Sequence, residues 1–293
     1  MSNFLKGTGV ALATPFSADN SIDFNGLTNL IEHCINGGVE YLVVLGTTAE
    51  SATLSKEEKI QLIAHVIKVN NDRLPLVLGI GGNNTAAVIE EMQNTDLSSF
   101  SAILSVVPMY NRPTQEGILA HYKEINAATS LPILLYNVPS RTGVNMTAET
   151  TLKLANLDNI IGIKEAVGDF TQVLKIIKDK PKDFLVISGD DTLALPAVAA
   201  GGAGVISVVG QGIPKEFSNT IRLGLAGKTD QAFSELYKIM PLIDYAFAEG
   251  NPAGIKSILK QQGVCDDHVR LPLVAASDKL SKTIQNFMTT LSI

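Results

Sequence analysis

A single lysine interrupts a strongly apolar run at residues 160–166, which read IIGIKEA. An ammonium group is costly in an apolar interior unless it is paired or loses its proton. Lys164 is therefore a candidate for a neutral amine that forms a Schiff base with a carbonyl substrate. The alternative is a structural lysine at a strand end, whose head reaches solvent or pairs with a carboxylate. Residues 160–166 alone favour the structural role, because structural lysines outnumber catalytic ones.

Two tyrosines stand at the ends of other apolar runs, Tyr110 after residues 101–107 and Tyr136 within residues 132–138. Dehydration of the carbinolamine that precedes a Schiff base must move protons on and off one oxygen. Two phenols beside the lysine would supply that proton relay. A single tyrosine in such a place would be unremarkable, since phenols often cap cores.

Groups that can bind carboxylates follow two of these runs. Residues 46–50 read GTTAE, and Thr47 and Thr48 can offer hydroxyl and backbone N–H groups to the carboxylate of an α-keto acid. Arg141 lies on the loop after residues 132–138 and can hold a second carboxylate through two hydrogen bonds. The alternatives are a simple turn with a helix cap for the threonines and a surface ion pair for the arginine.

These residues need a scaffold that brings strand ends together. Short apolar, β-branched runs alternate with helical patterns along the chain, which indicates βαβ units and a parallel sheet. The runs are evenly spaced and no nucleotide-binding glycine motif follows them, so we expect a (β/α)8 TIM barrel that uses no cofactor. In such a barrel the active site lies at the C-terminal ends of the strands. Eight runs are found, at residues 9–14, 41–45, 75–80, 101–107, 132–138, 160–166, 184–188 and 204–208.

Several residues stand where a helix should begin. Ser55 with Glu58 fits a capping box, in which each side chain satisfies a backbone N–H of the first turn. Further expected N-caps are Thr85, Thr114, Thr147 and Asp169.

The two-residue period of a strand puts Gly162, Lys164 and Ala166 on one face of the lysine strand. The odd-numbered residues in 161–165 lie on the other face. If the first set points into the barrel, the lysine stands beside two small residues, which leaves room for a substrate.

After residue 208 the chain has helical periodicity and no further strand pattern. We expect helices at residues 214–226, 230–247, 252–262 and 277–291, the first completing the barrel and the other three forming a C-terminal extension. The predicted domains are a catalytic barrel at residues 1–226 and a helical extension at residues 227–293. We assign the extension to packing or oligomer contacts and to no chemistry.

Composition narrows the class of protein. A formal charge of -6 and a pI near 5.3 argue against nucleic-acid binding, which needs a basic surface. Residues 194–210 are apolar, but Pro196 and the GGAG cluster at 201–204 divide them into pieces too short to span a membrane. The chain starts without a signal-peptide pattern, so we expect a cytoplasmic location. Cys34 and Cys265 are expected to be free thiols.

We expect no metal site. The four histidines are scattered along the chain and mostly fall on helical patterns. Asp190 and Asp191 follow the seventh apolar run, where aspartates more often cap the next helix than bind a metal.

Taken together, five segments resemble the dihydrodipicolinate synthase family of pyruvate-dependent class I aldolases and lyases. The likeness runs over essentially the whole chain, with the motifs in family order. The segments are GTTAES at 46–51, YNRP at 110–113, YNVPSRTG at 136–143, GIKEA at 162–166 and SGDD at 188–191.

The resemblance implies a reaction. Lys164 would condense with pyruvate to an imine, whose enamine attacks the aldehyde of L-aspartate 4-semialdehyde. Cyclisation would then free the lysine and release 4-hydroxy-tetrahydrodipicolinate, on the way to diaminopimelate and lysine. By likeness Tyr136 is the general acid and base, and Thr47 and Tyr110 complete the relay.

The resemblance also implies binding roles and an assembly. Thr48 would bind the pyruvate carboxylate, Arg141 the semialdehyde carboxylate, and Gly189 and Ile206 would make backbone contacts in the pocket. The residue that matches Tyr110 reaches into the neighbouring subunit's site in this family. A homo-oligomer is therefore expected, commonly a homotetramer built as a dimer of dimers.

Two alternatives stay open. N-acetylneuraminate lyase shares the barrel and the lysine, but that family usually follows its lysine with Phe-Thr or a similar pair and lacks an arginine matching Arg141. A non-catalytic barrel subunit is the alternative from a different class, and the full set of polar residues speaks against it. Ala49 replaces the more usual glycine, which we interpret as a tolerated change in a turn.

Feedback inhibition by lysine is expected to be weak or absent. In lysine-inhibited members of the family, the positions matching Lys56, Ala87 and Met109 often carry histidine, glutamate and tyrosine, which contact the bound lysine. Here a cation replaces one polar contact, and the carboxylate and phenol are missing.

Overall fold

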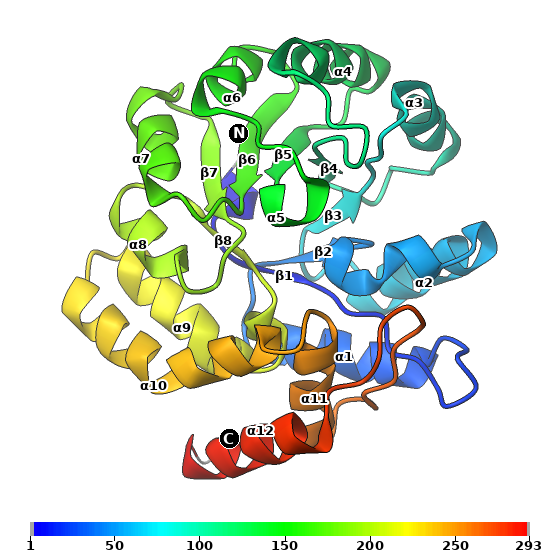
Figure 1. Ribbon diagram of the computed structural model, residues 1–293, viewed down its shortest axis with the longest axis vertical. Helices are drawn as coiled ribbons and strands as arrows, with labels where there is room; N and C mark the ends of the chain where they lie inside the picture. Colours follow the sequence, from blue (N-terminus) through cyan, green and yellow to red (C-terminus); the bar gives the residue numbers. More distant parts are fainter. Residues whose placement is uncertain (1–2, 292–293) are drawn as a thin grey trace.

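The computed structural model describes residues 3–291, in which eight strands close into a barrel surrounded by helices (Figure 1). Each strand pairs in parallel with the next, and β8 pairs with β1 to close the sheet. The (β/α)8 TIM barrel predicted from the sequence is confirmed. The strands are β1 (Gly7–Ala11), β2 (Tyr41–Val44), β3 (Leu76–Gly79), β4 (Ala102–Val106), β5 (Ile133–Asn137), β6 (Ile160–Glu165), β7 (Leu185–Ser188) and β8 (Gly204–Ser207).

Helices follow the strands along the chain, and three more lie beyond the barrel. Those that alternate with the strands are α1 (Phe24–Asn36), α2 (Lys56–Asn70), α3 (Thr85–Asn94), α4 (Gln115–Ala128), α5 (Pro139–Thr142), α6 (Ala148–Leu154), α7 (Phe170–Asp179), α8 (Ala194–Ala199) and α9 (Pro214–Leu225). The extension consists of α10 (Thr229–Phe247), α11 (Ala253–Gln261) and α12 (Asp278–Leu291). Short 3-10 helices include η2 (Thr47–Ala49) and η3 (Ser51–Thr53) after β2.

The first strand lies earlier than the predicted residues 9–14. The N–H of Leu12 still donates to the Val43 carbonyl at 3.0 Å, and there the pairing with β2 ends. Thr14 turns its hydroxyl toward the carbonyl of Ala49 at 2.7 Å, so a side-chain bond to η2 replaces the strand ladder.

Most of the predicted helix starts are confirmed. Ser55 and Glu58 form a reciprocal capping box, and the side chains of Thr114, Thr147 and Asp169 each accept a backbone N–H of the following helix. The prediction for Thr85 is wrong by one residue. Asn84 is the N-cap of α3, because its side-chain oxygen accepts the N–H groups of residues 86 and 87. The Thr85 hydroxyl pairs instead with His121 Nδ1 at 2.9 Å.

The face pattern of β6 is confirmed except at its start. Lys164 and Gly162 lie inside the barrel, whereas Ile163 belongs to the outer core between strands and helices. Ile161, predicted to face outward, packs against the inner cluster instead. The pairing of β6 with β5 shifts register between Ile160 and Gly162, and such a bulge breaks the two-residue alternation.

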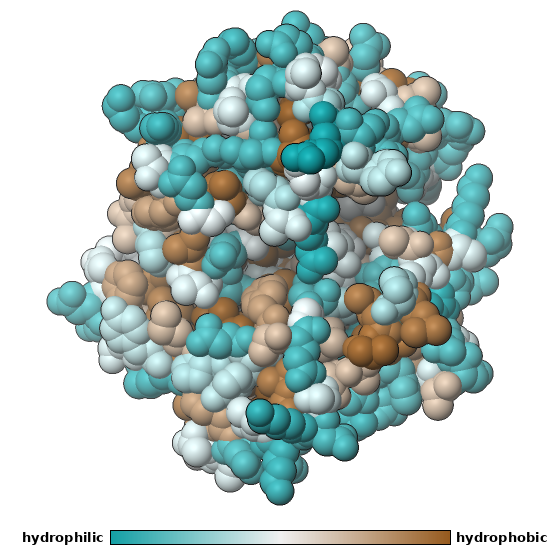
Figure 2. Space-filling view, viewed as in Figure 1, coloured by the Kyte–Doolittle hydropathy of each residue, from teal (hydrophilic) through white to brown (hydrophobic). Residues whose placement is uncertain are grey.

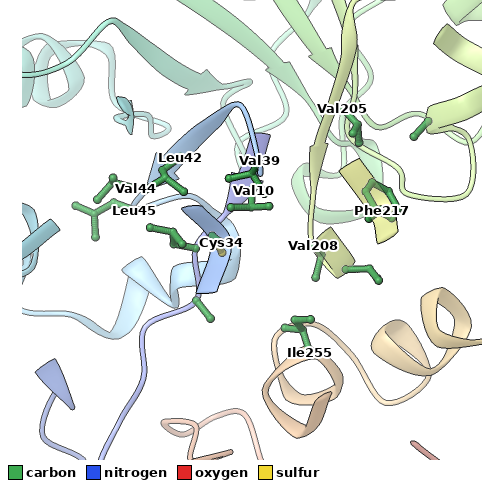
Figure 3. Packing of buried hydrophobic residues seen from close by; sticks show 14 of the residues in the cluster. Val10, Cys34, Val39, Leu42, Val44, Leu45, Val205, Val208, Phe217 and Ile255 are labelled. Atoms are coloured by element: carbon green, nitrogen blue, oxygen red, sulfur yellow. The ribbon is translucent and has the colours of Figure 1, made fainter. Parts of the chain in front are cut away.

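The extension shares one hydrophobic core with the barrel. Val10 of β1, Phe217 of α9 and Ile255 of α11 are buried members of one cluster (Figure 3). In Figure 1, α10 runs beside α9 and leads into α11, so the extension covers one side of the barrel. The division into domains at residues 1–226 and 227–293 stays a prediction.

Two further features of the chain are settled by the structure. Cys34 and Cys265 are free thiols, as predicted. None of the helices in residues 3–291 is long and apolar enough to cross a membrane.

Candidate active site

Lys164 stands in a cavity at the C-terminal end of the barrel. It lies in the middle of three strands, paired with Tyr136 of β5 and Ile187 of β7. Only 5% of the residue is exposed, although its head lines a cavity of about 490 Å³. A buried amine at the wall of a cavity is in the place that attack on a carbonyl carbon requires.

Tyr136 is a proton-transfer group beside that amine. Lys164 Nζ lies 4.3 Å from the centre of the Tyr136 ring, and both residues line the cavity. The register of β5 with β6 fixes this neighbourhood, because Tyr136 and Lys164 are direct partners across the ladder. The phenol can therefore exchange a proton with the oxygen bound to the carbon that the amine attacks.

The turn after β2 brings two hydroxyls to the opposite wall. Thr47 and Thr48 begin η2 and line the same cavity as Lys164. The Thr48 hydroxyl oxygen accepts a hydrogen bond from Asn251 Nδ2 at 2.9 Å. Its own O–H stays available as a donor, which is the role that binding of a carboxylate needs.

Arg141 lies on α5 at the rim of the cavity. One guanidinium nitrogen donates to the backbone carbonyl of Asn251 at 3.3 Å, and the residue also lines a second hollow next to the first. Thr47, Tyr136 and Asn251 line both hollows as well. The arginine thus stands where a substrate entering the cavity would pass.

Gly189 leaves space for the lysine, and Ile206 does not line the cavity. A Cβ atom on Gly189 would lie 3.0 Å from Lys164 Cε and 2.8 Å from the Ala166 Cβ, so a side chain there would push the lysine aside. Ile206 is fully buried in the inner cluster. The predicted backbone contacts of these two residues stay predictions.

The predicted space beside Gly162 is not found. A Cβ on Gly162 would lie 2.6 Å from the Leu185 carbonyl oxygen and 3.0 Å from Leu134 Cδ1. This glycine makes room for the neighbouring strands, and only Ala166 of the two small residues lines the cavity.

The extension contributes to the cavity, which the sequence interpretation did not foresee. Asp244, Phe247 and Ala248 from the end of α10 and its following residue line it, together with Asn251. The extension therefore packs against the cavity as well as the barrel, and the assignment of no chemistry to it stays a prediction. Helical periodicity shows which face of a helix is buried, but it carries no signal for a contact about two hundred residues away in the chain.

Tyr110 is not brought to this cavity. It is 88% exposed, and its backbone has a left-handed φ of 69° on the loop after β4. Its backbone N–H donates to the Thr142 carbonyl at 3.3 Å. Within a single chain Tyr110 does not line the cavity that holds Lys164, and its predicted part in the relay stays a prediction.

The two aspartates after β7 accept hydrogen bonds from nearby backbone and side-chain groups. Asp190 Oδ1 accepts the N–H groups of Thr192 and Leu193 in the turn that precedes α8. The predicted capping of the next helix is wrong, because the N-cap of α8 is Leu193 and no side chain caps that helix. Asp191 is buried and accepts from the Ser207 hydroxyl and the Val208 N–H. Burial raises the pKa of the Asp191 carboxyl to about 6, against the lowering effect of its hydrogen bonds.

Glu165, the last residue of β6, is buried in a network of amide groups. Its carboxyl oxygens accept from Asn137 Nδ2 at 2.9 Å, Gln172 Nε2 at 3.1 Å and the Val167 N–H at 3.0 Å. Burial raises the pKa of Glu165 to about 7, and these hydrogen bonds only partly oppose it. Asn137 follows Tyr136 in β5, and Glu165 follows Lys164 in β6. The hydrogen bond between Asn137 and Glu165 therefore ties the ends of these two strands together.

Glu165→Gln is expected to remove one part of the pH dependence of stability. The folded protein holds a proton on Glu165 from its ordinary pKa of 4.5 up to about 7, where the unfolded chain has lost it. The free energy of unfolding therefore falls over that window as pH rises, by about 3 kcal/mol from this residue. Urea unfolding of both proteins across this range measures the difference. If the difference in free energy of unfolding between the two proteins does not change with pH, the raised pKa of Glu165 is contradicted.

The cavity assembles four kinds of group that act on carbonyl compounds. They are a buried amine, a phenol beside it, hydroxyls that can donate to a carboxylate, and an arginine at the rim. Located at the C-terminal ends of barrel strands, these groups define an enzyme of the barrel lyase class.

The chain belongs to the dihydrodipicolinate synthetase family, whose sequence model matches residues 4–291. The 4-hydroxy-tetrahydrodipicolinate synthase of Flavobacterium psychrophilum is 57% identical over 98% of this chain and 98% of its own. A dihydrodipicolinate synthase of Acinetobacter baumannii, solved in complex with pyruvate, is 37% identical with a TM-score of 0.95 over 99% of both chains. That of Thermotoga maritima is 34% identical with a TM-score of 0.96, also over 99% of both. The family predicted from the sequence is confirmed.

Proposed function

We propose that this protein is a 4-hydroxy-tetrahydrodipicolinate synthase that joins pyruvate to L-aspartate 4-semialdehyde through a Schiff base on Lys164. The observation that carries the proposal is the buried amine of Lys164 beside the Tyr136 ring, on the wall of a cavity that Thr48 and Arg141 also line. The relatives named above carry this activity in their names, and one was solved with pyruvate. A cytoplasmic location is part of the proposal.

The first half of the reaction uses the groups around the amine. Lys164 Nζ attacks the keto carbon of pyruvate, whose carboxylate accepts from the Thr48 hydroxyl. Tyr136 gives a proton to the carbinolamine oxygen, which leaves as water, and the imine forms. Loss of a methyl proton then gives the enamine.

The second half uses the arginine at the rim. Arg141 holds the carboxylate of the semialdehyde, and the enamine carbon attacks its aldehyde carbon. The semialdehyde's own amino group then attacks the imine carbon and displaces Lys164 Nζ. The product leaves as the cyclic 4-hydroxy compound, and the amine is free again.

A direct assay tests the substrate pair. Purified protein with pyruvate and L-aspartate 4-semialdehyde should form the cyclic product, and N-acetylneuraminate should not be cleaved. Cleavage of N-acetylneuraminate without turnover of the semialdehyde would replace this proposal with the sister activity. No reaction with either would favour a non-catalytic barrel.

The proposal includes a homo-oligomer in which Tyr110 completes the partner's relay. Leu271 and Val274 are 80% and 70% exposed, and Figure 2 shows a brown apolar patch where the loop before α12 lies in Figure 1. Met109 and Leu273 line one hollow, so the Tyr110 loop adjoins this segment. Two copies joined here would cover the apolar patch and the exposed phenol together.

Mixing two inactive variants tests that arrangement. In a mixed dimer of Tyr110→Phe and Lys164→Ala, one site has an intact lysine and receives an intact phenol from the other chain. Co-expression with two affinity tags should therefore restore about a quarter of wild-type activity in the unselected statistical mixture, and about half after purification on both tags. Activity no higher than that of the separate variants would rule out a shared site, and sedimentation should show at least a dimer.

We also propose that lysine inhibits this enzyme weakly or not at all. Lys56 and Ala87 line one hollow of about 330 Å³ between α2 and α3, and Met109 lines the adjoining one. Neither Ala87 nor Met109 offers a carboxylate or a phenol to an amino acid. Titration of lysine into the assay should leave most activity at millimolar concentration. Strong inhibition below one millimolar would overturn this prediction.

A further inference from the structure

A buried ion pair joins the extension to the turn that carries Thr47 and Thr48. Lys256 of α11 is fully buried, and its Nζ lies 2.6 Å from Glu50 Oε1. Nζ also donates to the His268 carbonyl at 2.7 Å, and Glu50 Oε2 accepts the Arg270 N–H at 2.9 Å. Both charged groups are thus surrounded by partners from segments more than two hundred residues apart.

Stability alone is a weak reason for such a pair. Removing two charges from water costs about as much as their attraction returns, and apolar side chains of the same size often serve as well. Burial lowers the pKa of Lys256, and the Glu50 carboxylate opposes that shift. Buried pairs are best understood where they fix one arrangement of the chain among several.

The arrangement fixed here is the turn after β2. Glu50 has a left-handed backbone with φ 53° and ψ 34°, which ends η2 and begins η3. Its carbonyl accepts the N–H and the hydroxyl of Thr53, and its N–H donates to Thr47 O. Residues with a side chain rarely adopt this conformation, so an outside anchor is needed to hold it.

A second contact from the same part of the extension reaches the turn itself. Asn251, which lies just before α11, donates through Nδ2 to the Thr48 hydroxyl oxygen. Movement of α11 relative to β2 would therefore shift both the Glu50 anchor and the Thr48 contact. The extension therefore contacts Thr48 directly and Glu50 directly, and both residues belong to the turn that lines the cavity with Lys164.

We propose that the Glu50–Lys256 ion pair is a positioning device that sets the Thr47 and Thr48 hydroxyls against Lys164. Glu50 and Lys256 are positioning residues and touch no substrate. The inference rests on the proposed function, because it assigns the threonines to binding and proton transfer at the lysine.

The test measures pyruvate binding without the second substrate. Borohydride reduction traps the pyruvate imine on Lys164, and the pyruvate concentration for half-maximal trapping reports binding. Measured well below the melting temperature of the variant, Glu50→Gln should raise that concentration about tenfold or more. A binding group that is misplaced by about 1 Å loses much of its effect. In a protein that already carries Thr48→Val, adding Glu50→Gln should raise the half-maximal pyruvate concentration little further. The effects of two residues that act through the same contact are not additive.

A matched control separates positioning from general stability. Glu58 binds the guanidinium of Arg270, whose backbone N–H is bound by Glu50. Glu58 itself lies outside the turn that carries Thr47 and Thr48. Glu58→Gln should lower the melting temperature and leave half-maximal trapping within about twofold of wild type, as expected for loss of a partly exposed ion pair.

A double variant keeps the test decisive if Glu50→Gln folds poorly. Glu50→Gln with Lys256→Met leaves no unpaired buried charge, so most of the melting temperature should return, while half-maximal trapping should stay raised. Wild-type-like trapping in either folded variant, or full additivity with Thr48→Val, would overturn the positioning role. If wild-type protein forms no adduct, the proposed function itself fails, which is a different outcome.

Discussion

Lys164→Ala is expected to lose at least about 10⁴-fold in kcat while the barrel stays folded. Without the amine no covalent intermediate forms, and the remaining cavity groups can only bind substrates. The change removes a buried polar head from the wall of an existing cavity, so the melting temperature should fall little. Steady-state kinetics with both substrates, together with thermal unfolding, measure the two effects.

Lys164→Arg is the matched control for that prediction. It keeps a long side chain with a nitrogen head, but a guanidinium does not form the imine. It should be as inactive as the alanine variant. If either variant keeps more than about one per cent of wild-type activity, the covalent role of Lys164 is wrong.

Tyr136→Phe is expected to lower kcat by about 10²–10³-fold. The ring is 6% exposed and packs in the inner cluster, so phenylalanine should keep the packing and remove only the proton donor. Formation of the imine should slow by a similar factor, because water must leave the carbinolamine without a proton from the phenol. Stopped-flow measurement of imine formation separates this step from later ones.

Tyr122→Phe gives a control in the same strand neighbourhood. Tyr122 is buried on α4 and does not line the cavity, and its hydroxyl donates to the Ser105 carbonyl at 2.8 Å beside the backbone of Tyr136. Its loss should cost about 1 kcal/mol of stability and leave kcat unchanged. A Tyr136→Phe variant within about threefold of wild type would remove this tyrosine from the relay.

The barrel was predictable because its strands are strongly patterned. Apolar runs with β-branched residues recur between helix-start signals, and the two-residue period of β6 places Lys164 on the same face as Ala166. The exceptions are local. A bulge at the start of β6 turns Ile161 toward the inner cluster, and a side-chain bond from Thr14 ends β1 early.

The candidate site was predictable only where strand ends carry it. Tyr136, Thr48 and Arg141 meet Lys164 because parallel strands bring their C-terminal ends to one place. Asn251 could not be found in this way, since it precedes a helix in the extension and reaches Thr48 across 203 residues of sequence. Contacts of that kind depend on how α10 and α11 pack on the barrel, which no local pattern encodes.

The buried network around Glu50 was likewise hidden in the sequence. Glu50 was predicted only as the last residue of a turn, and Lys256 as one position on a helix. The structure joins them at 2.6 Å, because helix α11 packs with Ile255 and Ile258 in the core and so carries its lysine inward. The burial of a lysine on a helix can be predicted only when the group that pairs with its charge is known.

Trapping of the imine tests the central claim most directly. Wild-type protein incubated with pyruvate and reduced with borohydride should gain one pyruvate-derived group per chain, and peptide mapping should place it on Lys164. Lys164→Ala should gain none under the same conditions. No adduct on the wild-type protein, or an adduct that survives Lys164→Ala, would contradict the account.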